Sequence, residues 1–351
     1  MKKPLLYLFL GIFLGAMGLY VTRVFRSQLR KRHASQVELA RIDWAEQSHS
    51  NVSANPHFRN RFSVCDDELL LNYFNLKRDR KTQALKVESN LETWNRFLPL
   101  FERWPQGLQD YCERYVSHVY VVGQLGSSAY VLQQNDSSFT ILIDHEAMES
   151  LPNDWFTNRE RTSVDLASGY TINHRIEADS NNRPEFTLES LLMHEVAHCI
   201  GITTGQTRKF DSSWERLGEN SLLEGVFQAS NVSLEMTPEN REHFEDLHYY
   251  RNQRLSIEEY IKRLSSLRNS PFPTMYSSVN DLEYFADYFY AYVHCFVQQR
   301  PLAYSVYKQN KKEVAIECGI SLPHHEKSRA IISNILIELD SNIQKADARN
   351  N

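Results

Sequence analysis

The chain has few of the residues that mark several common classes of protein. Its 351 residues include only 12 glycines and no glycine-rich loop of the kind that cradles a phosphate. The net charge is -5, and no basic stretch with interleaved aromatics is present, so nucleic acid is not an expected partner. The five cysteines, at positions 65, 112, 199, 295 and 318, have no close pairing. That spacing is typical of scattered reduced thiols rather than of a disulfide framework.

Long uncharged apolar sequence is concentrated at the N-terminus. The run from Pro4 to Thr22 has about 19 residues and is long enough to cross a bilayer. Residues 16–18 make a poor signal-peptide cleavage site, so we expect a retained single-pass anchor. The basic residues after the run favour a cytoplasmic domain, whereas the short charged tail before it suits export. Both orientations stay open, and we favour the extracytoplasmic side.

The segment His194-Glu195-Val196-Ala197-His198 places two histidines four residues apart in an apolar run. On a helix both imidazoles lie on one face and can bind one ion. Zinc accepts imidazole nitrogen and leaves room for a third protein ligand and a water. Glu195 can take a proton from that water. The spacing therefore predicts one zinc ion per chain and hydrolysis of a peptide bond. Histidines that are simply satisfied inside the core are the alternative interpretation.

The helix that carries this motif is expected to begin after an N-cap at Thr187 and to end at Gly201. The residues beyond it leave three possibilities for the third ligand. A metzincin would need a histidine at position 204, where this chain has threonine. A short, thermolysin-like spacing would use Glu219 or Glu224.

The third possibility is Glu283, on a predicted helix that Ser278 or Asn280 can cap. Asp287 follows Glu283 by four residues and lies on the same helix face. It can accept a hydrogen bond from the far nitrogen of a ligating histidine. The neighbouring residues are mostly apolar, so a solvated acidic face is a poor explanation for the pair. We predict His194, His198 and Glu283 as the metal ligands.

The pairing of His194-Glu195-x-x-His198 with Tyr276, Glu283 and Asp287 resembles the catalytic domain of anthrax lethal factor and the Pro-Pro endopeptidases similar to it. These are gluzincin-type zinc metallopeptidases, and the resemblance covers roughly residues 95 to 300. It implies zinc ligands at His194, His198 and Glu283, a general base at Glu195 and an oxyanion donor at Tyr276. It also implies that Asp287 orients a ligating histidine. Nothing in the sequence indicates a preference for proline substrates.

The expected fold class is α+β. A zincin-like metallopeptidase domain at residues 61–345 would have a small mixed sheet, the HExxH helix and a mostly helical C-terminal half. It would follow an N-terminal transmembrane helix with its basic flank at residues 1–32 and a polar linker at residues 33–60. The stretch between His198 and Glu283 is longer than the family suggests, and residues 212–266 are expected to form a helical insert.

Shorter patterns indicate the other elements. Helical patterns cover residues 90–101 and 106–115. Segments rich in β-branched and aromatic residues predict strands at 118–122, 129–132, 139–143 and 169–173. In zincins the edge strand just upstream of the zinc helix pairs with the extended substrate, and we expect that role for residues 169–176. Most of the other histidines are expected to be exposed.

These features together predict a membrane-anchored, zinc-dependent endopeptidase that acts on a protein or peptide substrate. One alternative is an anchored binding protein that retains the fold without catalysis. Another is a metallohydrolase with a non-peptide substrate. Glu195 and Tyr276 are both present, which favours catalysis over the binding protein.

Overall fold

The computed structural model describes Gln36 and residues 57–78, 83–89, 91–135, 138–208, 221–229, 234–245, 247–250, 253–317 and 319–350. The predicted anchor and most of the predicted linker lie outside these residues. Within them, no helix combines the length and apolar character needed to cross a membrane. The chain divides into two compact units. One includes residues 66–84 and holds α2 (Glu68–Arg78). The other includes residues 57–65 and the chain from residue 85 onward.

A four-stranded mixed sheet lies in the second unit, in the order β1 (Phe62–Val64), β2 (Val116–Val122), β4 (Ser138–Asp144) and β3 (Ala129–Asn135). The first three strands are parallel, and β3 is an antiparallel edge strand. The centre of β4 is buried, which suits its β-branched and aromatic residues. The predicted strands at 118–122, 129–132 and 139–143 are thereby confirmed.

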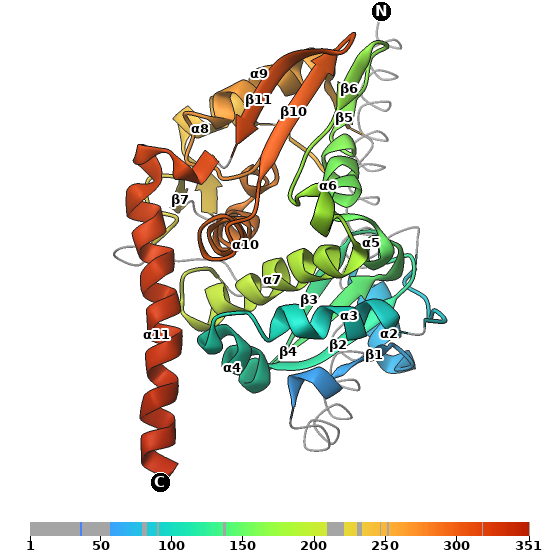
Figure 1. Ribbon diagram of the computed structural model, residues 1–351, viewed down its shortest axis with the longest axis vertical. Helices are drawn as coiled ribbons and strands as arrows, with labels where there is room; N and C mark the ends of the chain where they lie inside the picture. Colours follow the sequence, from blue (N-terminus) through green and yellow to red (C-terminus); the bar gives the residue numbers. More distant parts are fainter. Residues whose placement is uncertain are drawn as a thin grey trace, which may run out of the picture. The chain divides into compact units, whose positions relative to one another are not determined.

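Helices pack around this sheet (Figure 1). The predicted helices at 90–101 and 106–115 are confirmed as α3 (Glu92–Phe101) and α4 (Gln106–Tyr115). The HExxH motif is on α7 (Pro184–Thr203), which contacts α3 and the strands β3 and β4. Almost all of α7 is buried, so its apolar residues form part of the core and hold the motif rigidly.

The predicted ends of the HExxH helix were wrong. The helix begins at Pro184, because proline suits the first helical position. The Thr187 hydroxyl donates to the Ser150 carbonyl instead of capping the helix. Gly201 lies inside the helix, and a Cβ there would meet the Phe285 ring at 2.8 Å. The glycine therefore permits a close approach of the next layer rather than a helix end.

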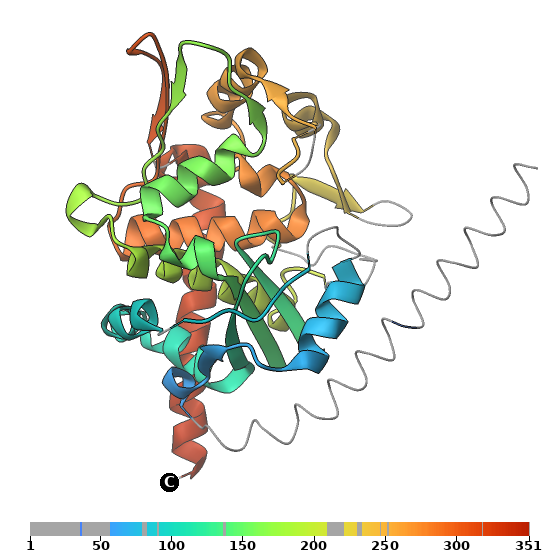
Figure 2. The same cartoon turned by 90° about the vertical axis from the view of Figure 1, so that its right-hand side faces the viewer.

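That next layer is α10 (Asp281–Tyr292), which packs directly on α7 (Figures 1 and 2). Asn280 caps α10, because its side-chain oxygen accepts hydrogen bonds from the backbone N–H groups of Leu282 and Glu283. A short 3-10 turn, η4 (Tyr276–Ser278), comes just before this cap. The cap fixes where α10 begins and so fixes the position of Glu283 in its first turn.

The C-terminal half contains more strand than the sequence predicted. A three-stranded sheet has the order β11 (Lys311–Glu317), β10 (Ala303–Lys308) and β6 (Tyr170–Ile172). Two short pairs are β5 (Val164–Asp165) with β9 (Leu255–Ser256), and β7 (Phe227–Ala229) with β8 (Leu234–Met236). The expectation of a mostly helical chain after His198 missed the β10–β11 hairpin, in which burial alternates along β10 but not along β11.

The remaining helices complete the α+β architecture. They are α5 (His145–Glu149), α6 (Pro152–Arg161), α8 (Pro238–Phe244), α9 (Ile257–Leu267) and α11 (Glu326–Asn350). Single turns occur at η2 (Phe58–Asn60), η3 (Asp179–Asn181), η6 (Gly319–Ser321) and η7 (Pro323–His325), and a π-helical turn, η5 (Val293–Val297), extends α10. The described part of the expected insert at 212–266 contains both strands and helices.

Candidate metal centre

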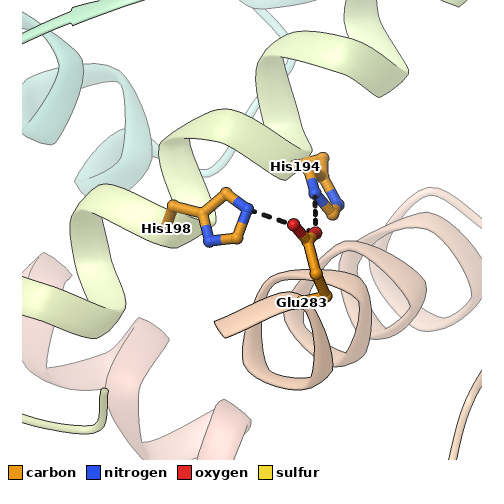
Figure 3. Close-up of side chains that lie close together, drawn as sticks. All are labelled: His194, His198 and Glu283. Carbon is orange, nitrogen blue, oxygen red and sulfur yellow. Dashed lines mark hydrogen bonds and ion pairs between the residues drawn. The ribbon is translucent and has the colours of Figure 1, made fainter. Parts of the chain in front are cut away.

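Two histidines from α7 and one glutamate from α10 converge on one point (Figure 3). Nε2 of His194 lies 3.1 Å from Oε2 of Glu283, and Nε2 of His198 lies 3.5 Å from the same oxygen. One ligand atom from each residue falls within 4.8 Å of the others. These are the three residues that the sequence predicted as ligands.

The spacing of the three side chains fits a single metal ion. Atoms bound about 2.1 Å from a tetrahedral ion lie about 3.4 Å from one another. The two histidine-to-glutamate distances, 3.1 and 3.5 Å, bracket that value. Two imidazoles with one carboxylate form a donor set that suits zinc and several other divalent transition metals. The cluster can therefore hold a metal ion.

Asp287 lies one turn after Glu283 and faces the other nitrogen of His194. Its Oδ1 is 2.8 Å from Nδ1 of His194, which places the two atoms within hydrogen-bonding distance. Its other carboxylate oxygen accepts a hydrogen bond from the Thr274 hydroxyl. Asp287 is fully buried, so its carboxylate lies behind the imidazole of His194, whose Nε2 lies toward Glu283.

Glu195 and Tyr276 border the same small cavity. The cavity has a volume of about 40 Å³, and its lining residues are Ser127, Ser128, Ala129, Trp155, Arg159, Leu191, His194, Glu195, Tyr250 and Tyr276. The Tyr276 ring centroid lies 6.0 Å from that of His194. A carboxylate and a phenol thus border the space beside His194.

Burial and neighbouring charges shift the pKa values of the groups in this site. Burial lowers the pKa of His194, but contacts with Asp287 and Glu283 outweigh burial and raise that pKa to about 10. Burial raises the pKa of Glu283, but His198 and His194 outweigh burial and hold it well below its usual range. In the metal-free protein the imidazole of His194 is therefore protonated near neutral pH, and a metal ion that binds there would replace that proton.

The two remaining groups are set for proton handling. Burial raises the pKa of Glu195, against the opposing effect of the two histidines. A carboxyl with a raised pKa is a better base near neutral pH than an exposed one. Burial, followed by the charge of Glu283, raises the pKa of Tyr276 well above its usual range. Tyr276 therefore stays protonated and can donate a hydrogen bond.

The other candidates for the third ligand do not join the cluster. Glu224 is exposed, and its Oε2 accepts from Nζ of Lys327 at 2.7 Å. The Thr204 hydroxyl donates to the Ile200 carbonyl within the helix. Glu219 lies outside the described residues.

The expectation of exposed histidines was wrong for His174, His294 and His325, which are all buried. Nε2 of His294 lies 2.7 Å from the carbonyl oxygen of Ile176 and 3.0 Å from that of Pro301. These partners are backbone groups. Burial lowers the pKa of His174 to about 3 and that of His294 to about 4, so both are neutral core histidines.

The strand that borders the cavity is β3 rather than the predicted segment 169–176. Residues of that segment form β6, which pairs with β10 in the other sheet. Ala129 at the start of β3 lines the cavity, and within the described sheet β3 pairs with β4 alone. The sequence indicated a strand at 129–132 but carried no signal of which strand would be the edge.

Sequence reasoning also missed Arg159. This residue is 7% exposed, lies at the end of α6 and contacts both Asp287 and Tyr276. An arginine near the C-terminal end of a helix is usually a surface residue whose charge interacts favourably with the helix dipole. Only the fold shows that this one points inward.

Comparisons of this chain with models of protein families, with curated proteins and with solved structures found no match.

Proposed function

We propose that the protein is a zinc-dependent endopeptidase, anchored to a membrane by residues 4–22, that cleaves a protein or peptide substrate. The observation that carries the proposal is the convergence of His194, His198 and Glu283, together with a cavity that His194 lines with Glu195 and Tyr276. The arrangement corresponds to that expected of a zincin, and the resemblance to lethal-factor-like peptidases supplies the same roles for these residues.

The chain's own groups divide the chemistry between them. His194, His198 and Glu283 would hold the ion, and Asp287 would orient His194. A bound zinc ion supplies a Lewis acid that acidifies a water and polarises a carbonyl. Glu195 takes the proton of the attacking water and later delivers it to the leaving amine. Tyr276 donates a hydrogen bond to the oxygen on which negative charge develops.

The outer edge of β3 is the surface that we expect an extended substrate to occupy. Its pairing with β4 leaves the opposite edge without a strand among the described residues. A peptide can add to such an edge through main-chain hydrogen bonds. Ala129 lies where this edge reaches the cavity, so a bound peptide would pass next to Glu195.

The deciding experiment measures zinc content and peptide cleavage in the full-length chain. Wild type is compared with Glu283→Ala, with Glu195→Gln and with Glu224→Ala as the matched control. Wild type and Glu224→Ala should each hold one zinc ion per chain, and Glu283→Ala should lose most of it. Glu195→Gln should keep zinc and lose cleavage by at least about 100-fold, because the proton acceptor is gone.

Three results would contradict the proposal. Full zinc in Glu283→Ala would place the third ligand elsewhere. Unchanged cleavage by Glu195→Gln would remove the general base from the mechanism. Zinc binding without cleavage of any peptide in wild type would favour an anchored binding protein or a non-peptide hydrolase.

A further inference from the structure

Arg159 is a buried cation next to the candidate site. Its guanidinium carbon lies 4.7 Å from the centroid of the Tyr276 ring, and the rings of Phe156 and Trp155 lie 4.9 and 5.5 Å from it. The guanidinium therefore packs against three aromatic rings, one of which belongs to Tyr276, the predicted oxyanion donor. A cation over an aromatic face is attracted to that ring and restrains its orientation.

The same guanidinium faces two buried carboxylates. Nη1 lies 3.8 Å from Oδ1 of Asp287, and Nη2 donates to Oε1 of Glu160 at 3.2 Å. Oδ1 of Asp287 is also the atom that lies 2.8 Å from Nδ1 of His194. One carboxylate oxygen thus lies between a metal ligand and Arg159.

The surroundings of this cation are arranged to keep it in place. Glu160 is fully buried, and its Oε2 accepts from the hydroxyls of Tyr249 at 2.6 Å and Tyr260 at 3.4 Å. A buried arginine is costly unless its charge is paired, and apolar residues would fill the same volume at less cost. The network is therefore better explained by a requirement for charge at this position than by packing alone.

We propose that Arg159 is a positioning residue of the candidate metal centre, where one guanidinium fixes both the Tyr276 ring and the Asp287–His194 pair. This inference rests on the proposed function, because it assigns Arg159 to the same site. It links the predicted metal ligand His194 to the predicted oxyanion donor Tyr276. These two residues come from different elements, α7 and η4.

The first test is the zinc affinity of the full-length protein, measured by competition with a chelator, for wild type, Arg159→Met and Arg159→Lys. Arg159→Met should weaken zinc binding by about 10- to 100-fold, because Asp287 loses the charge that fixes it behind His194. Arg159→Lys should restore most of that affinity. The visible spectrum of the cobalt-substituted protein should change in Arg159→Met, because the orientation of a ligand changes.

Arg61→Met is the matched control. Arg61 is also buried, at 8% exposure, and its Nη1 donates to the carbonyls of Glu113 and Val116, which lie on α4 and β2. Its replacement should lower the melting temperature and leave zinc affinity within twofold of wild type. Equal losses of zinc affinity in Arg61→Met and Arg159→Met would assign Arg159 to stability alone and overturn the inference.

A second test covers the case in which Arg159→Met does not fold. Arg159→Lys and Tyr276→Phe are combined in a double-mutant cycle, with fluorescein-labelled casein as substrate. Arg159→Lys should lower kcat about tenfold with little change in KM, because lysine does not reproduce a stacked guanidinium. The loss should shrink in the Tyr276→Phe background. Fully additive losses would contradict the inference.

The two proposals fail in different ways. If wild type binds zinc but cleaves no casein or other peptide, the peptidase proposal falls while the zinc affinities still decide the role of Arg159. If wild type binds zinc and cleaves, but Arg159→Met folds with the zinc affinity and kcat of wild type, only the role of Arg159 falls.

Discussion

At the residue scale, Tyr276 combines a fixed position with a proton that it does not lose. Its ring is restrained between Arg159 and Tyr249, whose ring lies 4.8 Å away in an edge-on arrangement. A donor aimed at developing charge acts mainly in the transition state rather than in substrate binding. Tyr276 is therefore expected to affect kcat much more than KM.

Replacement of Tyr276 by phenylalanine tests this expectation. We predict that Tyr276→Phe lowers kcat by about 100- to 1000-fold, the range found for the loss of one oxyanion donor, with KM nearly unchanged. Steady-state kinetics on a cleaved peptide, with Tyr170→Phe on β6 as the control, provide the measurement. A change confined to KM would show that Tyr276 binds substrate without stabilising the transition state.

A second prediction concerns Glu177, which is fully buried and whose Oε1 accepts from Nη1 of Arg300 at 3.0 Å. Burial, opposed by Arg300 and reinforced by Glu189, raises the pKa of Glu177 from 4.5 to about 7. Between pH 4.5 and about pH 7, Glu177 is protonated in the folded state and deprotonated in the unfolded state. The contribution of protonated Glu177 to the free energy of unfolding is therefore complete below about pH 4.5 and is lost as pH rises through about 7.

Glu177→Gln should remove that pH dependence. We expect the variant to match wild type near pH 5 and to exceed it in stability near pH 8, by at most about 3 kcal/mol. Denaturant unfolding at the two pH values measures the difference. Parallel stability curves for the two proteins would show that Glu177 does not change its protonation in this range.

At the element scale, the site depends on how closely α7 and α10 approach. Gly201 lies on α7 against Phe285, which follows Glu283 by two residues on α10. Because the third ligand and the two histidines come from different helices, the distance between these helices sets the geometry of the cluster. Glycine at position 201 is thus a packing requirement of the site.

Gly201→Ala should push the helices apart. A Cβ would lie 2.8 Å from the Phe285 ring and 2.8 Å from the Thr207 hydroxyl. We expect a loss of about 1–3 kcal/mol from overpacking, offset in part by the better helix propensity of alanine. Zinc affinity should fall several-fold. The double variant Gly201→Ala/Phe285→Leu should recover zinc affinity, and a failure to do so would separate the glycine from the site.

At the scale of the whole molecule, a metal ion would join two layers of the second unit. His194 and Glu283 are 89 residues apart in the chain, and only the packed fold brings them together. Any ion that binds the folded but not the unfolded chain stabilises the protein by mass action. The site is therefore also expected to contribute to stability.

Thermal unfolding with and without zinc measures this contribution. At a free zinc concentration 100 times the Kd, the gain should be about 2.7 kcal/mol. The melting temperature should rise by several degrees and fall again with EDTA. Glu283→Ala should show little response to either addition. An equal rise in wild type and Glu283→Ala would indicate zinc binding at another place.

The sequence by itself determined the features that depend on local periodicity. The spacing of His194 and His198, and that of Glu283 and Asp287, places each pair on one helix face whatever the surrounding fold. Asn280 was one of two caps, with Ser278, that local sequence offered for α10, and the structure has Asn280 in that position. The strands at 118–122, 129–132 and 139–143 were visible because β-branched and aromatic residues gather in them.

The tertiary structure decided what depends on contacts between distant segments. It showed that α10 faces α7, that β3 is the edge beside the cavity, and that Arg159 points inward to Asp287. No periodicity or residue spacing in the sequence indicates these contacts, because each depends on how the faces of distant helices and strands pack together. Gly201 illustrates the difference, since local rules indicate a helix end and packing against Phe285 overrides them.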